Sequence, residues 1–399
     1  MENRAAVSAT QVVHAGGQVP TGDSPSSSPA IHHAVTYHCP DAAHLDAVLS
    51  GEAKGFVYRR LGSPTVDALE LVLAELEGTE STLACESGMA ALHLAILASG
   101  AHSGRTVMAA QDLYGGTCAL LTQVLAAQGM EVVFADLQDM YLTAQLLQRH
   151  RPSVVIAETI SNPLLAVCDV PQLARLAHSV DASLVIDNTF ATPVLYRPHR
   201  DGADYVVHSA TKYLGGHGDV LAGIVAASGE AAQRARTLQQ IMGHVLDPTS
   251  AWLLLRSLKT LVVRMRQQCA AALAVAHFLS GHPRVATVHY PGLPSSRHYV
   301  LARRLFAAGM YGAIVSFEIA DAGQEQVFRF MDALGLVVPS TSLGDVCSLL
   351  LYPWHSSHRS LSEETKLARG IGKGLVRLSV GIEDAADIIA DLSQALARV

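Results

Sequence analysis

The feature that most constrains the fold is an alternation of two kinds of segment between Thr65 and Ala227. Apolar segments with helical spacing alternate with short runs that are rich in β-branched residues and lack polar alternation. The helix-like segments are 66–77, 88–99 and 117–128, and the strand-like runs are 106–110, 131–136, 153–159, 183–189, 203–209 and 221–228. Continuous apolar strands are typical of a sheet covered on both faces, and intervening helices imply crossover connections. This region therefore predicts a large α/β domain with a mainly parallel sheet.

The chain on either side of this region is organised differently. On the C-terminal side, a long helical stretch precedes one strand-like run and two helices, which predicts a smaller α+β domain. These segments are about 248–280, 312–319, 323–334 and 384–398. On the N-terminal side, the stretch 21–30 is rich in Ser, Pro and Gly, as in an extended arm that packs on another subunit. We therefore expect an arm at 1–62, a large domain at 63–259 and a C-terminal domain at 260–399, with ligands in the cleft between the domains.

Composition excludes several classes of protein. Hydrophobic residues make up 50% of the 399 residues, which excludes wholesale disorder. The net charge of −7 predicts no basic face for a nucleic-acid backbone. No apolar run reaches the roughly 18–20 residues of a membrane span, and the N-terminus lacks a secretory apolar core, so we expect a cytoplasmic protein. The six cysteines form no C-x-x-C pair and the histidines lack zinc-ligand spacing, so we expect reduced thiols and no metal site.

Two polar segments at predicted strand ends carry the strongest chemical signal. In 204–220, DYVVHSATKYLGGHGDV, a strand ends near Ser209 and Lys212 follows in a glycine-flanked turn. An amine nucleophile needs partial desolvation at a position that a cofactor can reach. In 185–193, VIDNTFATP, Asp187 ends an apolar strand, where a carboxylate is unfavourable unless it meets a partner such as a protonated ring nitrogen. One α/β unit separates the two residues, so neighbouring parallel strands would place them on the same edge of the sheet.

Three further motifs supply parts of the same kind of site. Ser87, Gly88 and Met89 open a helix, where free N–H groups and the helix dipole favour an anion such as a phosphate. Tyr114 precedes two glycines in QDLYGGT and could stack on a planar ring. Arg377 lies in an apolar strand-like run, and its guanidinium fork suits the carboxylate of an amino acid.

Each of these motifs alone also has a purely structural explanation. The lysine could be a solvated loop residue, the acid a cap, the helix start an N-cap, the tyrosine a core-packed turn residue and the arginine half of a salt bridge. Together they are the amine, acid, phosphate cradle, stacking ring and carboxylate clamp that a pyridoxal 5′-phosphate site requires. A nucleotide-binding fold fits less well, because no predicted strand is followed by G-x-G-x-x-G.

At these residues the chain resembles the Cys/Met-metabolism pyridoxal-phosphate enzymes, which include cystathionine γ-lyase, cystathionine γ-synthase, methionine γ-lyase and O-acylhomoserine sulfhydrylase. The resemblance extends from about Gln11 to the C-terminus. It rests on VYRRLGSPT (57–65), ESGMAA (86–91), DLYGGT (112–117), ETISNP (158–163), DNTFATP (187–193), HSATKYLGGHGDV (208–220), YPGL (290–293), TSLGD (341–345) and VRLSVGIED (376–384). It implies fold type I of the pyridoxal-phosphate-dependent transferases and a homotetramer of two catalytic dimers with shared active sites.

The resemblance also implies a role for each site residue. Lys212 would form the Schiff base with the cofactor, Asp187 would keep the pyridine nitrogen protonated, and Tyr114 would stack on the ring. The phosphate would be bound by Gly88, Met89, Ser209 and Thr211, together with Tyr58 and Arg60 from the partner subunit. The substrate would meet Arg377 at its carboxylate, with help from Ser342 and Asn162, and Thr341 at its distal end, while Glu158 would support the network around the cofactor.

The activity implied by the resemblance is γ-elimination on a sulfur amino acid such as methionine or cystathionine, which yields 2-oxobutanoate, ammonia and a thiol. Lys212 would move protons on the substrate, and Tyr114 would protonate the leaving sulfur. The alternative is γ-replacement on an O-acylhomoserine, as in cystathionine γ-synthase or O-acylhomoserine sulfhydrylase. It stays open because Thr341 stands where cystathionine-handling members carry glutamate, and Gly116 where methionine γ-lyases carry cysteine. A non-catalytic pyridoxal-phosphate-binding protein is the alternative of another class, and the intact set of catalytic residues argues against it.

Overall fold

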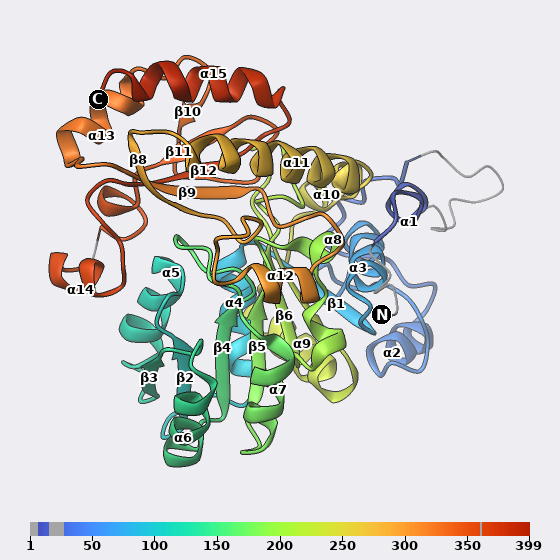
Figure 1. Ribbon diagram of the computed structural model, residues 1–399. Helices are drawn as coiled ribbons and strands as arrows, with labels where there is room; N and C mark the ends of the chain where they lie inside the picture. Colours follow the sequence, from blue (N-terminus) through green and yellow to red (C-terminus); the bar gives the residue numbers. More distant parts are fainter. Residues whose placement is uncertain (1–6, 16–27, 360) are drawn as a thin grey trace.

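Two sheets organise the computed structural model, which describes residues 7–15, 28–359 and 361–399 (Figure 1). The larger sheet contains β1 (Ser81–Cys85), β2 (Thr106–Ala110), β3 (Glu131–Ala135), β4 (Val154–Glu158), β5 (Ser183–Asp187), β6 (Tyr205–Ser209) and β7 (Gly223–Ala227), in the order β1-β7-β6-β5-β4-β2-β3. The smaller sheet contains β8 (Val285–His289), β9 (Ile314–Ile319), β10 (Val338–Pro339), β11 (Leu349–Leu351) and β12 (Leu375–Ser379), in the order β10-β11-β12-β9-β8. The predicted α/β fold class, with a large sheet followed by a smaller α+β part, is confirmed.

Helices cover both sheets. Along the larger sheet and its N-terminal approach they are α1 (Ala9–His14), α2 (Ala42–Leu49), α3 (Pro64–Glu77), α4 (Gly88–Ala98), α5 (Gly115–Ala119), α6 (Met140–His150), α7 (Val170–His178), α8 (Thr192–Leu195), α9 (Gly229–Met242) and α10 (Pro248–Leu258). The remaining helices are α11 (Leu261–Ser280), α12 (Tyr299–Leu305), α13 (Gln324–Asp332), α14 (Glu363–Ala368) and α15 (Ala385–Leu396). Figure 1 shows α11, α13 and α15 packed around the smaller sheet. None of the helices formed by the described residues has the length and apolar character needed to cross a membrane.

The larger sheet is parallel from β6 through β3, as predicted, but β7 runs antiparallel to both of its neighbours. The connection between β6 and β7, residues 210–222, contains no helix. Without a crossover the chain returns in the opposite direction, so this strand cannot be parallel to β6. The sequence also did not predict β1, which is a short run directly after α3.

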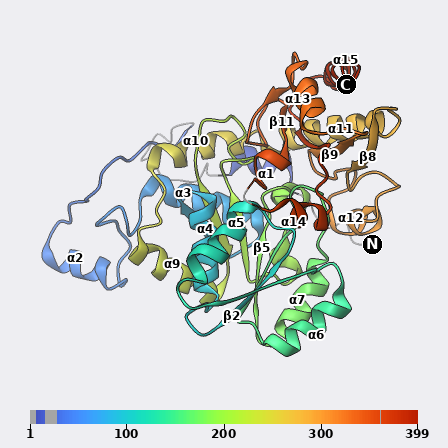
Figure 2. The same ribbon diagram turned by 90° about the vertical axis from the view of Figure 1, so that its left-hand side faces the viewer.

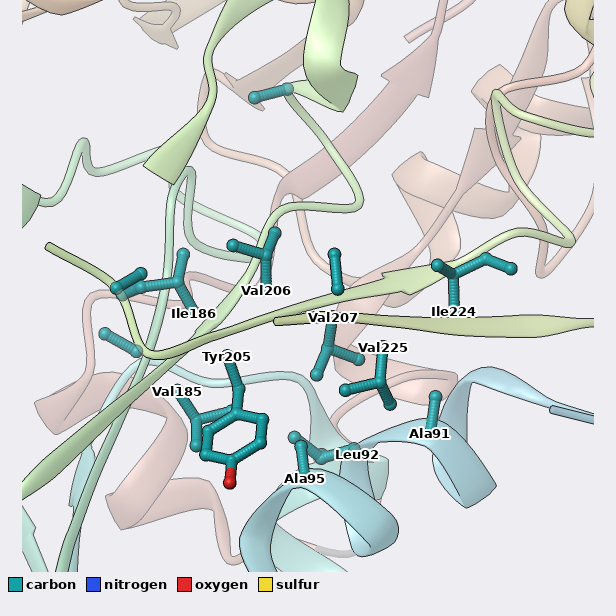
Figure 3. Close-up of a cluster of buried hydrophobic side chains, with 14 of the residues drawn as sticks. Ala91, Leu92, Ala95, Val185, Ile186, Tyr205, Val206, Val207, Ile224 and Val225 are labelled. Atoms are coloured by element: carbon teal, nitrogen blue, oxygen red, sulfur yellow. The ribbon is translucent and has the colours of Figure 1, made fainter. Parts of the chain in front are cut away.

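Helix α4 is held tightly against the sheet strands that lead to the site (Figure 3). The Tyr205 ring of β6 lies beside Leu92 and Ala95 of α4, and Val225 of β7 lies above Ala91, and all five residues are buried. The Tyr205 hydroxyl donates a hydrogen bond to the carbonyl of Ala98 at the end of α4, at 2.9 Å. Close packing of this kind leaves little freedom for a helix to shift. The start of α4 is therefore fixed relative to the end of β6.

Two of the predicted helices differ from their expected extent. The region 248–280 is divided between α10 and α11, and the Arg264 side chain donates to the carbonyl of Ser257, near the end of α10, at 3.1 Å. The segment 117–128 begins within α5 and continues as a π-helix at Leu120–Leu125. Apolar periodicity predicts a helix here but does not distinguish α from π hydrogen bonding.

The N-terminal segment is attached to the body only in part. Val12 of α1 is buried in the core of the larger sheet, whereas α2 buries none of its residues and projects away from the body in Figure 2. Most of the predicted extended stretch, residues 21–27, lies outside the described residues. At the other predicted boundary, α11 packs on both cores: Met265 lies in the larger and Val275 in the smaller. The three proposed domain ranges stay a prediction.

Candidate active site

A cavity of about 650 Å³ lies between the carboxyl end of the larger sheet and residues that precede and include β12. Most of the predicted site residues line it, namely Gly88, Met89, Tyr114, Glu158, Asn162, Asp187, Ser209, Thr211, Lys212, Thr341 and Arg377. Ser342 contacts two of them directly. Tyr58 and Arg60 lie elsewhere. Residues more than 250 positions apart in the sequence, such as Gly88 and Arg377, are thus brought to a single cavity.

The acid and the amine are positioned by the ends of adjacent strands. β4, β5 and β6 are parallel neighbours, and Glu158 and Asp187 are directly opposite each other in register. Lys212 follows the end of β6 in a turn, where its N–H donates to the carbonyl of Ser209 at 3.1 Å. In open α/β sheets, ligands bind outside the carboxyl ends of strands. The parallel pairing of β5 and β6 places Asp187 and Lys212 on one edge of the sheet, as predicted.

Asp187 is half-buried and is held by Thr189. The N–H of Thr189 donates to Oδ1 of Asp187 at 2.9 Å, and the Thr189 hydroxyl accepts the N–H of Ser209 at 2.8 Å. Burial raises the pKa of Asp187 above its ordinary value, while the hydrogen bonds from Thr189 and the charge of His208 lower it. A carboxylate in this setting favours a cationic partner in the cavity. Thr189 belongs to the motif singled out in the sequence, but its role as the link between two strands was not predicted.

Glu158 connects the turn at Tyr114 with Asn162, which in turn contacts Arg377. One of its oxygens accepts the N–H of Tyr114 at 2.6 Å, and the other accepts the N–H of Asn162 at 3.1 Å. Burial and the neighbouring charge of Asp187 raise the pKa of Glu158 well above its ordinary value. Both oxygens are therefore committed to positioning the backbone around the cavity.

The Lys212 amine has a polar partner but no counter-charge among the described residues. Its Nζ donates to the hydroxyl of Ser342 at 3.1 Å. Burial, followed by the positive charge of Arg377, lowers the pKa of the Lys212 amine. A lowered pKa increases the neutral fraction of the amine, which is the form that acts as nucleophile or base.

Arg377 is buried on β12 and is oriented by two acceptors. Its two terminal nitrogens donate to the side-chain oxygen of Asn162 and to the carbonyl of Ser342, each at 3.1 Å. Its Nε has no partner among the described residues, and burial lowers the pKa of the guanidinium to about 10. A buried guanidinium without a carboxylate is unfavourable on its own, so the site is suited to an anionic ligand.

The start of α4 forms a tight anion cradle. A Cβ on Gly88 would lie 2.7 Å from Cβ of Ser209, so only glycine allows this approach of the helix to β6. The Ser87 hydroxyl caps the helix by accepting the N–H of Ala90 at 3.1 Å. Thr211 exchanges hydrogen bonds with the backbone of Ala222, which fixes the turn beside Ser209. Helix N–H groups and hydroxyls in this arrangement suit a phosphate.

The sequence model of the family "Cys/Met metabolism PLP-dependent enzyme" matches residues 9–397. The chain belongs to this family. It is 39% identical to L-methionine gamma-lyase from Pseudomonas putida over 97% of this chain and 96% of that protein. It is 38% identical to cystathionine gamma-lyase from Bacillus subtilis over 98% and 99% of the two chains. The crystal structure of cystathionine gamma synthase from Xanthomonas oryzae pv. oryzae, in complex with aminoacrylate and cysteine, matches with a TM-score of 0.92 and 35% identity over 99% of this chain and 98% of that one.

The residues of the cavity fit the cofactor of this family, pyridoxal phosphate. The start of α4 offers free N–H groups to a phosphate, the half-buried carboxylate of Asp187 suits a protonated ring nitrogen, and the Lys212 amine has a lowered pKa. Arg377 lines the cavity and suits a substrate carboxylate. The predictions of family membership and of pyridoxal-phosphate dependence are confirmed.

Tyr58 and Arg60 lie outside the cavity, on the exposed N-terminal segment. The Arg60 guanidinium donates to the carbonyl of Gln240 and lies 5.6 Å from the centre of the Tyr58 ring. The Tyr58 side chain is 41% exposed. Their predicted role toward the phosphate of a partner subunit stays a prediction.

Several residues of the cavity were not predicted from the sequence. They are the apolar Leu92, Ile160, Phe190, Leu221, Leu343 and Leu351, and the polar His355, Ser356, Ser357 and Arg359. The polar group belongs to the segment around the 3₁₀ turn Pro353–His355, which has neither a periodic pattern nor a glycine-rich motif.

Proposed function

We propose that the protein is a carbon–sulfur lyase that performs γ-elimination on a sulfur amino acid such as methionine or cystathionine and releases 2-oxobutanoate, ammonia and a thiol. The observation that carries this proposal is the link through Ser342: its hydroxyl accepts from Lys212 and its carbonyl accepts from Arg377. The amine that would handle protons and the guanidinium that would hold the substrate carboxylate are thereby fixed relative to each other.

Each group of residues around the cavity would have a separate role toward the cofactor. When bound, pyridoxal phosphate supplies an electron sink that eases removal of a proton from the carbon beside the substrate amine. Asp187 would hold a proton at the ring nitrogen, and Tyr114 would cover the ring. The phosphate would be held by Gly88, Met89, Ser209 and Thr211.

Lys212 would carry the cofactor and then act as the base. Burial and Arg377 lower the pKa of its amine, so the amine gives up and accepts protons closer to neutral pH than an exposed lysine would. The Ser342 hydroxyl keeps the amine on the side of the cavity where Arg377 would place the substrate. Tyr114, at the turn held by Glu158, would protonate the leaving sulfur.

Arg377 would bind the α-carboxylate of the substrate. Asn162 and Ser342 orient the guanidinium plane, and Arg377 lines the cavity with no carboxylate partner among the described residues, so a substrate carboxylate would supply its counter-charge. The burial of Arg377 strengthens this contact because little water competes for it.

We also propose a homotetramer of two catalytic dimers in the cytoplasm. The exposed α2 and the position of Tyr58 and Arg60 away from their own cavity support an arm that reaches a partner's phosphate. All six cysteines are free thiols, as suits a reducing compartment.

γ-Replacement on an O-acylhomoserine is the second candidate. The similarity to a cystathionine gamma synthase structure favours it, as does Thr341, whose hydroxyl cannot supply a negative charge for a distal ammonium. Holoenzyme is incubated with methionine, cystathionine and O-acylhomoserine, the last with and without a thiol, and 2-oxobutanoate and thioether are quantified. Elimination predicts keto acid from the thioethers without added thiol. Thioether formation as the dominant reaction would overturn elimination, and no turnover of any substrate would overturn both.

A further inference from the structure

The cavity carries one positive charge that the proposed chemistry does not use. Lys212 and Arg377 have tasks toward cofactor and α-carboxylate, but Arg359 also lines the cavity. His355 lines it as well, yet burial and the charges of Lys366 and Arg359 lower its pKa, so it is neutral at neutral pH. Arg359 is therefore the remaining fixed cation of the cavity wall.

The neighbouring cations already have side-chain partners, whereas the Arg359 guanidinium has none among the described residues. Lys366 donates to the carbonyl of Trp354 at 3.0 Å and lies 4.9 Å from the centre of its ring, and Lys373 pairs with Glu363 at 2.5 Å. Within the part of the chain that the structure describes, no carboxylate forms an ion pair with Arg359.

The segment that carries Arg359 lies against the turn at Tyr114 and Gly115. The carbonyl of Ser357 occupies the space that a side chain at Gly115 would need, so the backbones of the two segments are in direct contact. Gly115 follows Tyr114, the residue proposed to protonate the leaving sulfur. A leaving group protonated by Tyr114 would therefore be near the wall that contains Ser357 and Arg359.

Among the described residues of the lining, the only carboxylates are Glu158 and Asp187, and Asp187 is already assigned to the ring nitrogen of the cofactor. Both oxygens of Glu158 accept backbone N–H groups, and Asp187 is held by Thr189. The nearby wall consists of the Thr341 hydroxyl and the apolar side chains of Leu343 and Leu351. A substituent that ends in a methyl group would leave Arg359 without a counter-charge.

We propose that the mouth of this cavity binds a carboxylate at the far end of the substrate's γ-substituent, with Arg359 as its partner. This inference rests on the proposed function and narrows its substrate class. The preferred substrates are thioethers of homocysteine, or esters of homoserine, whose substituent ends in an acid. A methyl thioether such as methionine is a poorer substrate of the same site.

Two thioethers that differ in terminal charge test this inference in the holoenzyme. S-(2-carboxyethyl)-L-homocysteine ends in a carboxylate, and S-propyl-L-homocysteine ends in a methyl group. Arg359→Gln should lower kcat/KM for the acid about tenfold, mainly through KM, as expected for loss of a solvent-accessible charged hydrogen bond, and should change the propyl compound less than about twofold. Arg359→Lys should retain part of the preference, and Arg175→Gln, an exposed arginine on α7 outside the cavity lining, should retain all of it.

A binding measurement separates this inference from the proposed reaction. L-2-aminosuberate and L-2-aminooctanoate replace the sulfur of the two thioethers by a methylene at the same chain length and have no leaving group, so calorimetric titration reports binding alone, and Arg359→Gln should weaken the aminosuberate about tenfold without affecting the aminooctanoate. Equal effects on both ligands, or none, would overturn the carboxylate subsite even if both thioethers yield 2-oxobutanoate. Charge-selective binding with no turnover of either thioether would overturn the proposed function and leave the subsite standing.

Discussion

The two walls of the cavity are built in different ways. The wall at the sheet edge places Glu158, Asp187 and Lys212 on or just after consecutive parallel strands, and backbone hydrogen bonds connect these strands in register. The opposite wall is made of turns around Ser342 and Arg359, together with Arg377 on β12 of the smaller sheet. A hydrogen-bonded sheet edge allows little adjustment, whereas turns accept substitution more readily. The wall at the sheet edge therefore suits the cofactor, whose chemistry is the same for every substrate. The wall made of turns suits selection among substrates.

The largest expected effect comes from removing the amine of the sheet-edge wall. Lys212→Ala should reduce turnover by at least about 10³-fold, because none of the other described residues that line the cavity has an amine to carry the cofactor or move protons. Steady-state assays of keto-acid release and the visible spectrum measure it. Lys259→Ala, outside the lining, is the matched control. Activity within tenfold of wild type in Lys212→Ala would refute the assignment.

On the opposite wall, Arg377→Ala should lower kcat/KM for amino-acid substrates by about 10²–10³-fold, mostly through KM. The substitution removes a buried, charge-assisted contact and leaves Asn162 and the Ser342 carbonyl without their donor. Arg377→Lys should recover little, since a lysine lacks the fork. An unchanged KM for every amino-acid substrate would remove Arg377 from the carboxylate role.

Gly88→Ala tests the fixed contact between α4 and β6. Its Cβ would lie 2.7 Å from Cβ of Ser209, which must shift the helix start by several tenths of an ångström and weaken the anion cradle. We expect cofactor affinity to fall about tenfold, and the free energy of unfolding to fall by about 1–3 kcal/mol. Equilibrium titration of apoenzyme with cofactor measures the first quantity. Gly281→Ala, where the nearest atom is 3.8 Å away, should change neither; wild-type affinity in Gly88→Ala would show that the cradle tolerates displacement.

The smallest effect is expected from Thr189→Val. The substitution removes a hydroxyl that stabilises the ionised form of Asp187 and that accepts the N–H of Ser209. A donor to a carboxylate favours its charged form and lowers its pKa, so losing this donor raises the pKa of Asp187. The acidic limb of the kcat/KM profile should therefore move to higher pH, with a loss of about threefold to tenfold at neutral pH. An acidic limb that stays in place would mean that Thr189 acts only on the packing of the two strands.

The difference between the walls also explains what the sequence could predict. The strands that carry Asp187 and Ser209 are short, continuous apolar runs, and parallel pairing then places their ends together, so this part of the site follows from pattern and topology. The apolar run around Arg377 also predicted that this residue lies in a strand. Its contacts with Asn162 and Ser342 depend on how the second sheet packs on the first, which periodicity does not encode. The sequence did not predict Arg359 for the same reason: its segment becomes part of the site only through its contact with the turn at Gly115.

The central claim is that Lys212 carries the cofactor opposite Asp187. Treating the holoenzyme with borohydride fixes the cofactor to whichever amine holds it, and peptide mapping by mass spectrometry then identifies that residue. The account predicts a phosphopyridoxyl group on the peptide that contains Lys212, and its loss in Lys212→Ala. Modification of a lysine outside the cavity, such as Lys259 or Lys366, in place of Lys212 would contradict it.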